Sequence, residues 1–409
     1  MCFLDSHNRH CNSLCCCAAR HMVRASQFLG VTMLHYGRQY LTSWTRIMTI
    51  FTLLSTGLST QVQAKTWATL NGQPPIVIGH RGLAGYFPDH TLAGYERAAE
   101  LGADFIEPDL VSTKDGVLIA RHEPNLKDTT DISERPEFAA YKRVEHVDGK
   151  DEEGWFACDL TLAQIKTLRA KQPRADRDPQ YNGQFEIPTF EEILQLRERV
   201  SKKLGREVGV YPETKHPTWH QEKGLPLEAK LVALLSTYHL NRADAPVYIQ
   251  SFELTNLRVL KQLSPVKRIY LIDGDDVLAD GAVTSGRAYD FVKKSDPRKY
   301  NEMMSDANLK EIAQVAQGIG PWKVYIDSYV TDASGIKTRI PATDVVKRAH
   351  AAGLALHPFT FRNEAKHLTD TDAGDPYNEY ALFFDLGVDG VFSDYTDTAV
   401  AARARMSKE

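Results

Sequence analysis

From residue 76 onward the sequence alternates short apolar runs with longer amphipathic segments. Residues 91–101 illustrate the second kind, because Leu92, Tyr95 and Ala99 fall on one stripe of a helix and a glycine follows the segment. Strands that alternate with helices build a parallel sheet, and this many units favour a closed barrel over an open doubly wound sheet. The sequence therefore predicts an α/β fold, a (β/α)8 barrel of the TIM type.

Nine apolar runs are candidate strands, one more than a regular eight-stranded barrel holds. Parallel neighbours need a long crossover, so the tight turn at Asp115-Gly116 marks the third run as the expected irregular strand. The candidate strands are residues 76–79, 105–110, 117–122, 208–211, 247–250, 268–272, 323–326, 354–357 and 390–392. The candidate helices are residues 91–101, 191–204, 227–240, 252–263, 307–318 and 343–352.

Two segments, residues 126–185 and 273–322, interrupt this alternation. Both are polar and rich in Asp, Lys, Arg and Pro, and both are much longer than the usual βα loop of about 2–6 residues. Long loops on the active face of a barrel usually shape or cover the site. We interpret both as insertions that shape or cover the site, as a lid would, with solvated surface loops as the alternative.

The first 64 residues differ from the rest in charge and apolar content. No acidic residue lies between Asp5 and Asp89, and basic residues precede an apolar run from Ile47 to Leu58. That run is shorter than the about 20 residues a membrane-spanning helix needs, and the Val-x-Ala that ends at Ala64 is typical of secretory cleavage. We expect a leader over residues 1–64 and one periplasmic domain over residues 65–409, with an uncleaved anchor or a disordered arm as the alternative.

Cysteine usage changes at the same boundary. Of the 6 cysteines only Cys158 follows Ala64, and one cysteine cannot form an intrachain disulfide. We therefore expect the hydrophobic core, and no disulfide, to stabilise the mature fold even in an oxidising compartment. Because cleavage would remove the apolar run, we also expect no stable membrane insertion afterwards. The stretch before the basic region is unusually long for a signal peptide, which makes Met22 or Met33 an alternative translation start.

Two carboxylates, Glu107 and Asp109, lie two residues apart in an apolar run, so an extended chain points both toward one face. If Asp115-Gly116 is a two-residue hairpin loop, pairing outward from it places Asp109 opposite His122 and Glu107 opposite Pro124. Directly opposed residues share a face of the sheet. The sequence thus predicts that these two acids converge with His122.

A third acid, Glu213, ends another apolar run. Buried charges without partners are costly, so a bound cation or salt bridges to residues such as Arg81 and Lys215 must compensate them. Three carboxylates with open positions suit a hard cation that prefers oxygen ligands. We expect Glu107, Asp109 and Glu213 to bind Ca²⁺, with Mg²⁺ or another divalent ion as the alternative.

The remaining chemistry falls on basic and aromatic residues at the ends of predicted strands. His80 and His122 are the acid/base candidates, because a histidine with an ordinary pKa of about 6.5 exchanges protons near neutrality, although each taken alone is more often structural. Arg81 and Lys215 are candidates for binding phosphate. Phe252, Phe359 and Phe361 could wall an alcohol group or serve simple packing. We interpret the other histidines, His90, His216, His220, His239, His350, His357 and His367, mostly as structural or surface residues, His357 with the least evidence because it ends a strand.

These residues together resemble the glycerophosphodiester phosphodiesterase family, in particular its exported bacterial type. The motifs run in the family's order over essentially the whole chain after the leader. They are His80-Arg81-Gly82, His90-Thr91, Glu107-x-Asp109, Lys114-Asp115-Gly116, Arg121-His122, Ile187-Pro188-Thr189-Phe190-Glu191-Glu192, Tyr211-Pro212-Glu213-Thr214-Lys215, Gln250-Ser251-Phe252, His357-Pro358 and Ser393-Asp394. Two positions depart from the family pattern while keeping its charge, namely Asp89 in place of a glutamate and Glu123 in place of an aspartate.

The resemblance implies a metal-dependent hydrolase (EC 3.1.4.46) that splits glycerophosphodiesters into glycerol 3-phosphate and an alcohol. It implies His80 and His122 as catalytic residues and the three carboxylates as metal ligands. The nucleophile is either water or the substrate's own 2-hydroxyl, which would give a cyclic phosphate first.

The composition limits the kinds of partner that this protein can have, and two alternative functions remain. The net charge is −4, and no cluster of basic residues offers a binding surface for nucleic acid. Small glycerophosphodiesters are therefore the expected partners. The sequence also leaves a homodimer open. One alternative is a phospholipase-type phosphodiesterase on the same barrel. The other is an exported binding protein that has lost turnover, although none of the candidate catalytic residues is missing.

Overall fold

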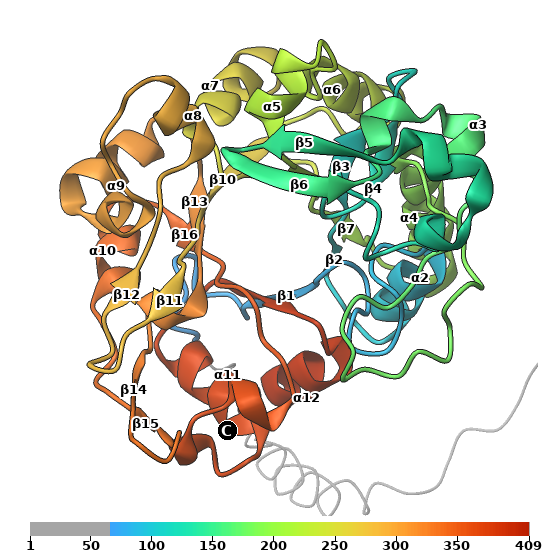
Figure 1. Cartoon of the computed structure of the whole chain (residues 1–409). Coiled ribbons are helices and arrows are strands. Elements are labelled where there is room, and N and C mark those ends of the chain that lie inside the picture. The colour runs from blue at the N-terminus through green and yellow to red at the C-terminus, as the bar shows by residue number, and fades with distance from the viewer. Residues whose placement is uncertain (1–65, 409) are drawn as a thin grey trace, which may run out of the picture. The chain divides into compact units, whose positions relative to one another are not determined.

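The alternation of strands and helices closes into a ring of strands with helices outside it (Figure 1). The structure is a computed structural model that describes residues 66–408. The leader and its expected cleavage site after Ala64 lie outside the described residues. Among residues 66–408, no helix combines the length and the apolarity needed to cross a bilayer.

Eight positions make up the barrel, and two of them are split into two short strands. The order around the ring is β17, β1, β2 with β3, β7 with β8, β9, β10, β13 and β16, and all these pairings are parallel. A single bridge between Phe361 and Ser393 joins the β16 side back to β17 and closes the ring. The expected α/β barrel is confirmed.

The strands are short, as expected for a barrel whose rims carry the loops. Their bounds are β1 Ile76–Gly79, β2 Phe105–Ile106, β3 Asp109–Ser112, β7 Gly209–Val210, β8 Glu213–Thr214, β9 Tyr248–Ser251, β10 Lys267–Ile272, β13 Gly318–Pro321, β16 Ala355–Leu356 and β17 Gly390–Ser393. The two splits coincide with Pro108 and Pro212, which lack the N–H that an unbroken ladder needs.

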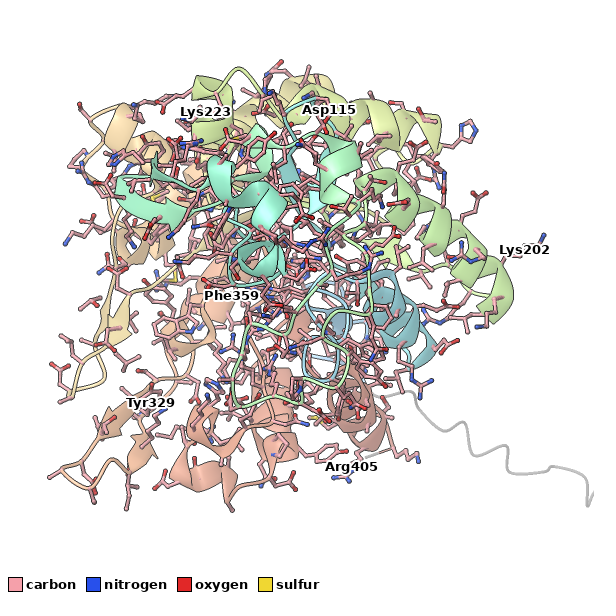
Figure 2. All side chains as sticks on the ribbon, turned by 45° about the vertical axis from the view of Figure 1, so that its right-hand side comes forward. Asp115, Lys202, Lys223, Tyr329, Phe359 and Arg405 are labelled. Carbon is pink, nitrogen blue, oxygen red and sulfur yellow. The ribbon has the colours of Figure 1, made fainter. Side chains whose placement is uncertain are left out.

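The outer ring holds the amphipathic segments and two further helices near the C-terminus. The main helices are α2 Leu92–Glu100, α4 Phe190–Leu204, α6 Glu228–Thr237, α7 Leu254–Leu263, α9 Asp306–Ala313, α10 Val345–Ala351, α11 Pro376–Asp385 and α12 Thr396–Met406. Local signals delimit α4 well: Thr189 and Glu192 form a capping box at its start, and Gly205 ends it with φ +63°. Lys202, near that end, extends into solvent (Figure 2).

The apolar core lies in two places. The larger cluster packs the outer face of the strands against the helices, with Val77, Ile106, Val210 and Ile249 among its members. A smaller cluster inside the barrel contains Tyr211, whose hydroxyl contacts His357 Nδ1 at 2.8 Å. His357 is thus a buried residue of the barrel interior, in line with its structural interpretation.

The ninth strand candidate lies outside the barrel. Strand β4, Leu118–Ala120, pairs antiparallel with β3, so the irregularity expected at the Asp115-Gly116 turn is confirmed. Its predicted register is wrong by one residue, because Leu110 faces Ala120 and the backbone N–H of Arg121 donates to the Asp109 carbonyl at 2.8 Å. Asp109 therefore lies opposite Arg121 and not opposite His122.

The turn itself explains the difference in register. The backbone N–H of Thr113 donates to the Val117 carbonyl, which leaves a three-residue loop that ends in Gly116 with φ +82°. The Asp115 carboxylate accepts hydrogen bonds from the Thr113 hydroxyl at 2.6 Å and from the backbone N–H of Leu162 at 2.9 Å. The turn is thus fixed by a contact with a distant segment.

Two further expectations fail around residue 320. Residues 323–325 form a short 3-10 helix, and the barrel strand at this position is β13, Gly318–Pro321, so the predicted strand over 323–326 is wrong. The predicted helix over 307–318 ends at Ala313 for the same reason. Glycine and proline make up three of the four residues of β13, which hides the strand from an apolar pattern.

The two insertions contain structure of their own. Residues 126–185 include the hairpin of β5, Arg143–Val147, and β6, Lys150–Gly154, and short helices such as α3, Leu162–Ile165. Their apolar residues, among them Leu126, Phe138 and Leu160, form a separate buried cluster against β3 and β4. Residues 273–317 include the hairpin of β11, Asp276–Val277, and β12, Val283–Thr284, helix α8, Tyr289–Lys293, and α9.

Candidate active site

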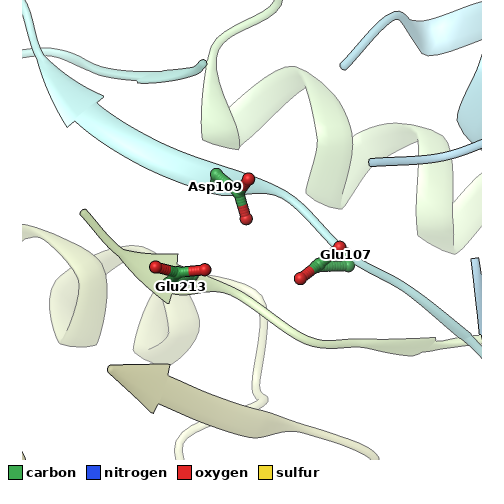
Figure 3. A group of neighbouring side chains, drawn as sticks. All are labelled: Glu107, Asp109 and Glu213. Carbon is green, nitrogen blue, oxygen red and sulfur yellow. The ribbon is translucent and has the colours of Figure 1, made fainter. Parts of the chain in front are cut away.

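Three carboxylates meet at one end of the barrel. Glu107, Asp109 and Glu213 flank the two prolines that split the strands, and the register places Asp109 beside Glu213. One oxygen of each lies within 4.8 Å of the others, and all three residues are at most 4 % exposed. Figure 3 shows their side chains turned toward one another. The predicted convergence of Glu107 and Asp109 is correct despite the register error.

Asp109 is the carboxylate that the surroundings hold ionised. Its Oδ2 contacts His90 Nε2 at 3.0 Å, and Arg81 Nε lies 3.7 Å away. Burial alone would raise the pKa of Asp109, but His90 and the cations around it hold that pKa well below its usual range. Its other oxygen, Oδ1, is buried without a hydrogen-bond partner among the described residues, a position that a bound cation would satisfy.

The other two carboxylates have partners but are less easily ionised. Glu107 accepts hydrogen bonds from the backbone N–H of Arg81 at 2.9 Å and from Gln250 Nε2 at 2.7 Å. Glu213 lies 3.0 Å from Lys215 Nζ. Burial and the neighbouring carboxylates raise the pKa of Glu107 far above its usual value, and burial raises that of Glu213 to about 7 against the opposing effect of Lys215. An ion with two positive charges would favour the ionised form of all three groups.

His80 follows β1 and lies beside the triad. Its Nδ1 contacts Asp394 Oδ1 at 2.5 Å, and its Nε2 lies 3.9 Å from Glu107 Oε2. Asp394 in turn pairs with Arg177 Nη2 at 2.6 Å and with Arg362 Nε at 3.1 Å. Burial lowers the pKa of His80 to about 4 although Asp394 opposes this effect, so the imidazole is neutral at pH 7. Because Nδ1 contacts a carboxylate, which can only accept, the single ring proton of neutral His80 lies on Nδ1, and the unprotonated Nε2 faces the site.

His122 has the same arrangement on the other side. Its Nδ1 contacts Glu123 Oε1 at 2.5 Å, and its Nε2 lies 3.2 Å from Lys215 Nζ. Burial, together with the charges of Arg81 and Lys215, lowers the pKa of His122 to about 3. Because an ammonium can only donate, the Lys215 contact requires an unprotonated Nε2. The chain leaves β4 after Ala120 and brings His122 into the cavity by a route that strand pairing did not predict.

Arg81 lies between these groups with its backbone in the left-handed region, at φ 56°. Its Nη1 pairs with Asp89 Oδ2 at 2.9 Å, and Arg174 from the first insertion pairs with the same carboxylate at 3.1 Å. Asp89, the departure noted in the sequence, is fully buried and therefore serves as the shared counter-ion of two arginines.

An open cavity of about 1300 Å³ lies above the carboxylates. Phe252 and Phe359 line it, with their rings 5.8 Å apart in an edge-to-face arrangement. Phe361, the third residue of the predicted wall, does not line the cavity, because it is fully buried against Tyr380 and Phe383 in the outer core. The structure therefore corrects the predicted wall to two phenylalanines.

Three residues that support this site were not predicted to do so, since His90 and His216 were interpreted as structural or surface residues and Asp394 only as part of a family motif. His90 holds Asp109, Asp394 holds His80, and His216 contacts Glu123. The motifs His90-Thr91 and Ser393-Asp394 were visible, but their contacts join residues far apart in the sequence. No local pattern could have revealed those contacts.

Comparison with known proteins identifies relatives along most of the chain. The model of the glycerophosphoryl diester phosphodiesterase family matches residues 80–398. A glycerophosphodiester phosphodiesterase of Arabidopsis thaliana is 37 % identical over 352 residues, which cover 83 % of this chain and 88 % of the relative. One from Haemophilus influenzae is 28 % identical over 349 residues, covering 80 % and 88 % of the two chains.

Solved structures agree on the fold. A phosphodiesterase of Oleispira antarctica, in complex with its product sn-glycerol-3-phosphate, superposes with a TM-score of 0.53. It is 20 % identical, and the match covers 82 % of this chain and 98 % of that one. This likeness supports the barrel architecture.

The Asp89 ion pairs predict a pH-dependent loss of stability on substitution. Burial would raise the pKa of Asp89, but Arg174 and Arg81 hold it below its usual value, so its contribution is complete above the unfolded-state pKa of about 3.9 and is lost as the pH falls further. Asp89→Asn should lower the free energy of unfolding by about 3 kcal/mol at pH 7, since two partly buried arginines lose their fully buried counter-ion, and by less at pH 3. Denaturant unfolding at both pH values measures this difference.

The control is Glu198→Gln on the exposed face of α4, which should change the free energy of unfolding by no more than about 0.5 kcal/mol. An Asp89→Asn deficit that is equal at pH 7 and pH 3 would contradict the assigned ionisation.

Proposed function

The chain belongs to the glycerophosphoryl diester phosphodiesterase family and is a glycerophosphodiester phosphodiesterase (EC 3.1.4.46), and we propose that it uses a divalent cation and two histidines to release glycerol 3-phosphate and an alcohol. One observation carries this proposal. The triad of buried carboxylates lies between two histidines, each of which has its Nδ1 on a carboxylate and its Nε2 on the side of the triad or of Lys215.

Glu107, Asp109 and Glu213 are the proposed metal ligands. Three facts support the fit: the donor set is all oxygen, the free Asp109 Oδ1 is buried, and the triad concentrates negative charge in a low-dielectric site. We propose Ca²⁺ as the ion in an exported enzyme. When bound, it would stabilise negative charge on the phosphate oxygens.

The chain's own residues perform the remaining steps. Arg81 and Lys215 present cationic groups beside the triad, where they bind and orient the non-bridging phosphate oxygens. The Nε2 atoms of His80 and His122 are the proton-transfer sites. The anionic phosphodiester favours a second proton on one of the two rings when it binds, and this ring gives its Nε2 proton to the departing alkoxide while the unprotonated Nε2 of the other ring accepts the proton of the nucleophile. Asp394 and Glu123 hold the opposite ring nitrogens and fix both tautomers.

The cavity supports a small substrate. Phe252 and Phe359 offer an apolar wall for the glycerol or alcohol carbons, next to the Lys215 ammonium, which lies 5.2 Å from the Phe252 ring centre. The rest of the cavity lining contains both acidic and basic side chains, among them Asp273, Lys323 and Arg362. This mixed lining supports acceptance of several headgroups.

We also propose export to the periplasm by a leader cleaved after Ala64. The charge asymmetry and the short apolar run before Ala64 support it. Amino-terminal sequencing of the exported protein should begin at or near Lys65. Recovery of an intact leader in the membrane fraction would overturn this proposal.

The activity itself is tested with defined diesters. The purified protein with Ca²⁺ should hydrolyse glycerophosphocholine, glycerophosphoethanolamine and glycerophosphoglycerol, because its polar contacts concentrate on phosphate and not on a headgroup. Release of glycerol 3-phosphate, followed by a coupled dehydrogenase, is the measurement. Inertness toward all three substrates with Ca²⁺ and with Mg²⁺ would refute the proposed function.

Removal of one ligand tests the metal assignment. Glu213→Gln should weaken Ca²⁺ binding by at least about 100-fold, since even residues one layer outside the ligands typically change metal affinity by about 10–100-fold. Calorimetric titration of the chelator-treated protein measures this affinity. Glu253→Gln is the matched control, because burial raises the pKa of that cavity glutamate to about 8 and glutamine therefore resembles its protonated form. Normal Ca²⁺ binding by Glu213→Gln would contradict the assignment.

Substitution of the histidines tests the proton transfers. His80→Ala and His122→Ala should each lower kcat by roughly 100-fold or more, and their effects should not add, because both act in one proton-transfer cycle. A nitrophenyl diester needs little protonation of its leaving group and should partly restore the variant that lacks the acid. His239→Asn, at an exposed histidine with φ 57°, should keep normal turnover. Near-normal kcat in both alanine variants would show that the histidines are structural.

A further inference from the structure

We propose that His216 is a positioning residue for the phosphodiester hydrolysis proposed above, which orients Glu123 and through it the imidazole of His122. His216 Nε2 lies 3.3 Å from Glu123 Oε2, while Glu123 Oε1 lies 2.5 Å from His122 Nδ1. One carboxylate thus bridges two histidines, and of the two His122 is the one that contacts Lys215, with its Nε2 3.2 Å from Lys215 Nζ. The inference rests on the proposed function for the role of His122.

A second carboxylate fixes the other side of the His216 ring. His216 Nδ1 lies 2.6 Å from Asp148 Oδ2, so the ring donates in both directions. Burial would lower the pKa of His216, but Asp148 and Glu123 raise it to about 9, and the charged ring is the form that donates from both nitrogens. Asp148 and Gly149 form the tip of the β5–β6 hairpin, both with positive φ. The first insertion therefore supplies the outermost group of this chain of contacts.

The backbone holds His216 in a fixed place. Its φ of 46° lies in the left-handed region, which is uncommon for a residue other than glycine, and the next residue is the Pro217 that begins helix α5, Pro217–Glu222. Its carbonyl accepts hydrogen bonds from both the backbone N–H and the ring Nδ1 of His220, at 2.9 and 3.0 Å. The imidazole thus projects from a rigid turn toward Glu123.

The hairpin is tied to α5 by two further contacts. Trp219 Nε1 donates to the His146 carbonyl at 3.0 Å, and Lys223 Nζ pairs with Glu145 at 2.7 Å. These contacts hold the hairpin independently of the Asp148–His216 pair. Loss of the His216 side chain should therefore release Glu123 without releasing the hairpin.

The site provides an internal precedent for such a residue. In the other histidine–carboxylate pair, His80 with Asp394, two arginines hold the carboxylate from behind, Arg177 and Arg362. In the pair of His122 with Glu123, His216 occupies the corresponding position. Glu123 depends more on such a supporting residue than Asp394 does, because the Glu123 side chain is 42 % exposed whereas that of Asp394 is fully buried. A partly exposed carboxylate with one partner fewer can turn toward water and release Nδ1 of His122.

The proposal predicts a defined kinetic pattern. His216→Ala should lower kcat for glycerophosphocholine by about 10-fold, the lower end of the range for residues that orient a functional group, with KM changed by less than about 2-fold. His216→Gln, whose amide N–H can still donate to Glu123, should recover part of this loss. His146→Gln, at an exposed histidine of the same hairpin whose side chain hydrogen-bonds to Asp151, should be without effect, because the substitution keeps the backbone contact with Trp219.

A double-mutant cycle separates positioning from simple support of the structure. If His216 acts through Glu123, the His216→Ala/Glu123→Gln double variant should be no slower than Glu123→Gln alone. Fully additive losses, or an unchanged kcat in His216→Ala, would overturn the proposal. If the alanine variant does not fold, His216→Gln takes its place in the cycle, and the same two outcomes decide.

A spectroscopic measurement makes the test independent of turnover. The Nδ1 proton of His122, assigned by its absence in His122→Ala, should give a hydrogen-bonded resonance in proton NMR that moves upfield or exchanges faster in His216→Ala and not in His146→Gln. A resonance that does not change would overturn the positioning role. A protein inert toward every glycerophosphodiester that still shows the shift would refute the proposed function while leaving the His216–Glu123–His122 contacts established.

Discussion

Three nearly buried carboxylates, with one oxygen of each within 4.8 Å of the others, are the constraint around which the rest of this molecule is arranged. Their mutual repulsion and their desolvation both oppose folding, so each needs compensation at short range. The compensation comes from groups of different kinds, a backbone N–H and an amide at Glu107, an imidazole at Asp109 and an ammonium at Glu213. These groups come from the turn after β1, the loop before α2, strand β9 and the end of β8, which the closed barrel brings to one point.

A second layer of charge lies behind the first, and the first insertion supplies much of it. Arg174 pairs with Asp89 and Arg177 pairs with Asp394, while Asp148 reaches His216 from the hairpin tip. The segment predicted to shape the site therefore does so through its ions as well as its shape. Arg177 acts on the carboxylate that holds His80, whereas Arg174 and Asp148 act one contact further out, through Asp89 on Arg81 and through His216 on Glu123. The chemistry of the barrel rim thus depends on residues inserted between its strands.

The sequence was sufficient for features that depend on neighbouring residues. The alternation of apolar runs and amphipathic segments predicted the barrel, and strand-end acids and histidines predicted the candidate site. The hairpin register could not be predicted, because the Asp115 carboxylate binds Leu162, 47 residues away. The His80–Asp394 contact spans 314 residues, so the role of Asp394 was equally hidden. Strand β13 was not predicted because three of its four residues are glycine or proline. Phe361 was misplaced because its position after a strand end does not tell the inner face of the barrel from the outer core.

The separate apolar centre of the first insertion has a consequence for the dynamics of the protein. A segment that buries its own cluster can open as a cooperative unit at a lower free energy than global unfolding, as native-state hydrogen exchange detects in other proteins. Opening of this unit would withdraw Arg174 and Arg177 and leave Asp89 and Asp394 with fewer counter-ions in a buried setting. The free energy of that local opening therefore includes the electrostatic energy of the active site. The ions that prepare the site for a phosphodiester also limit how often its cover opens.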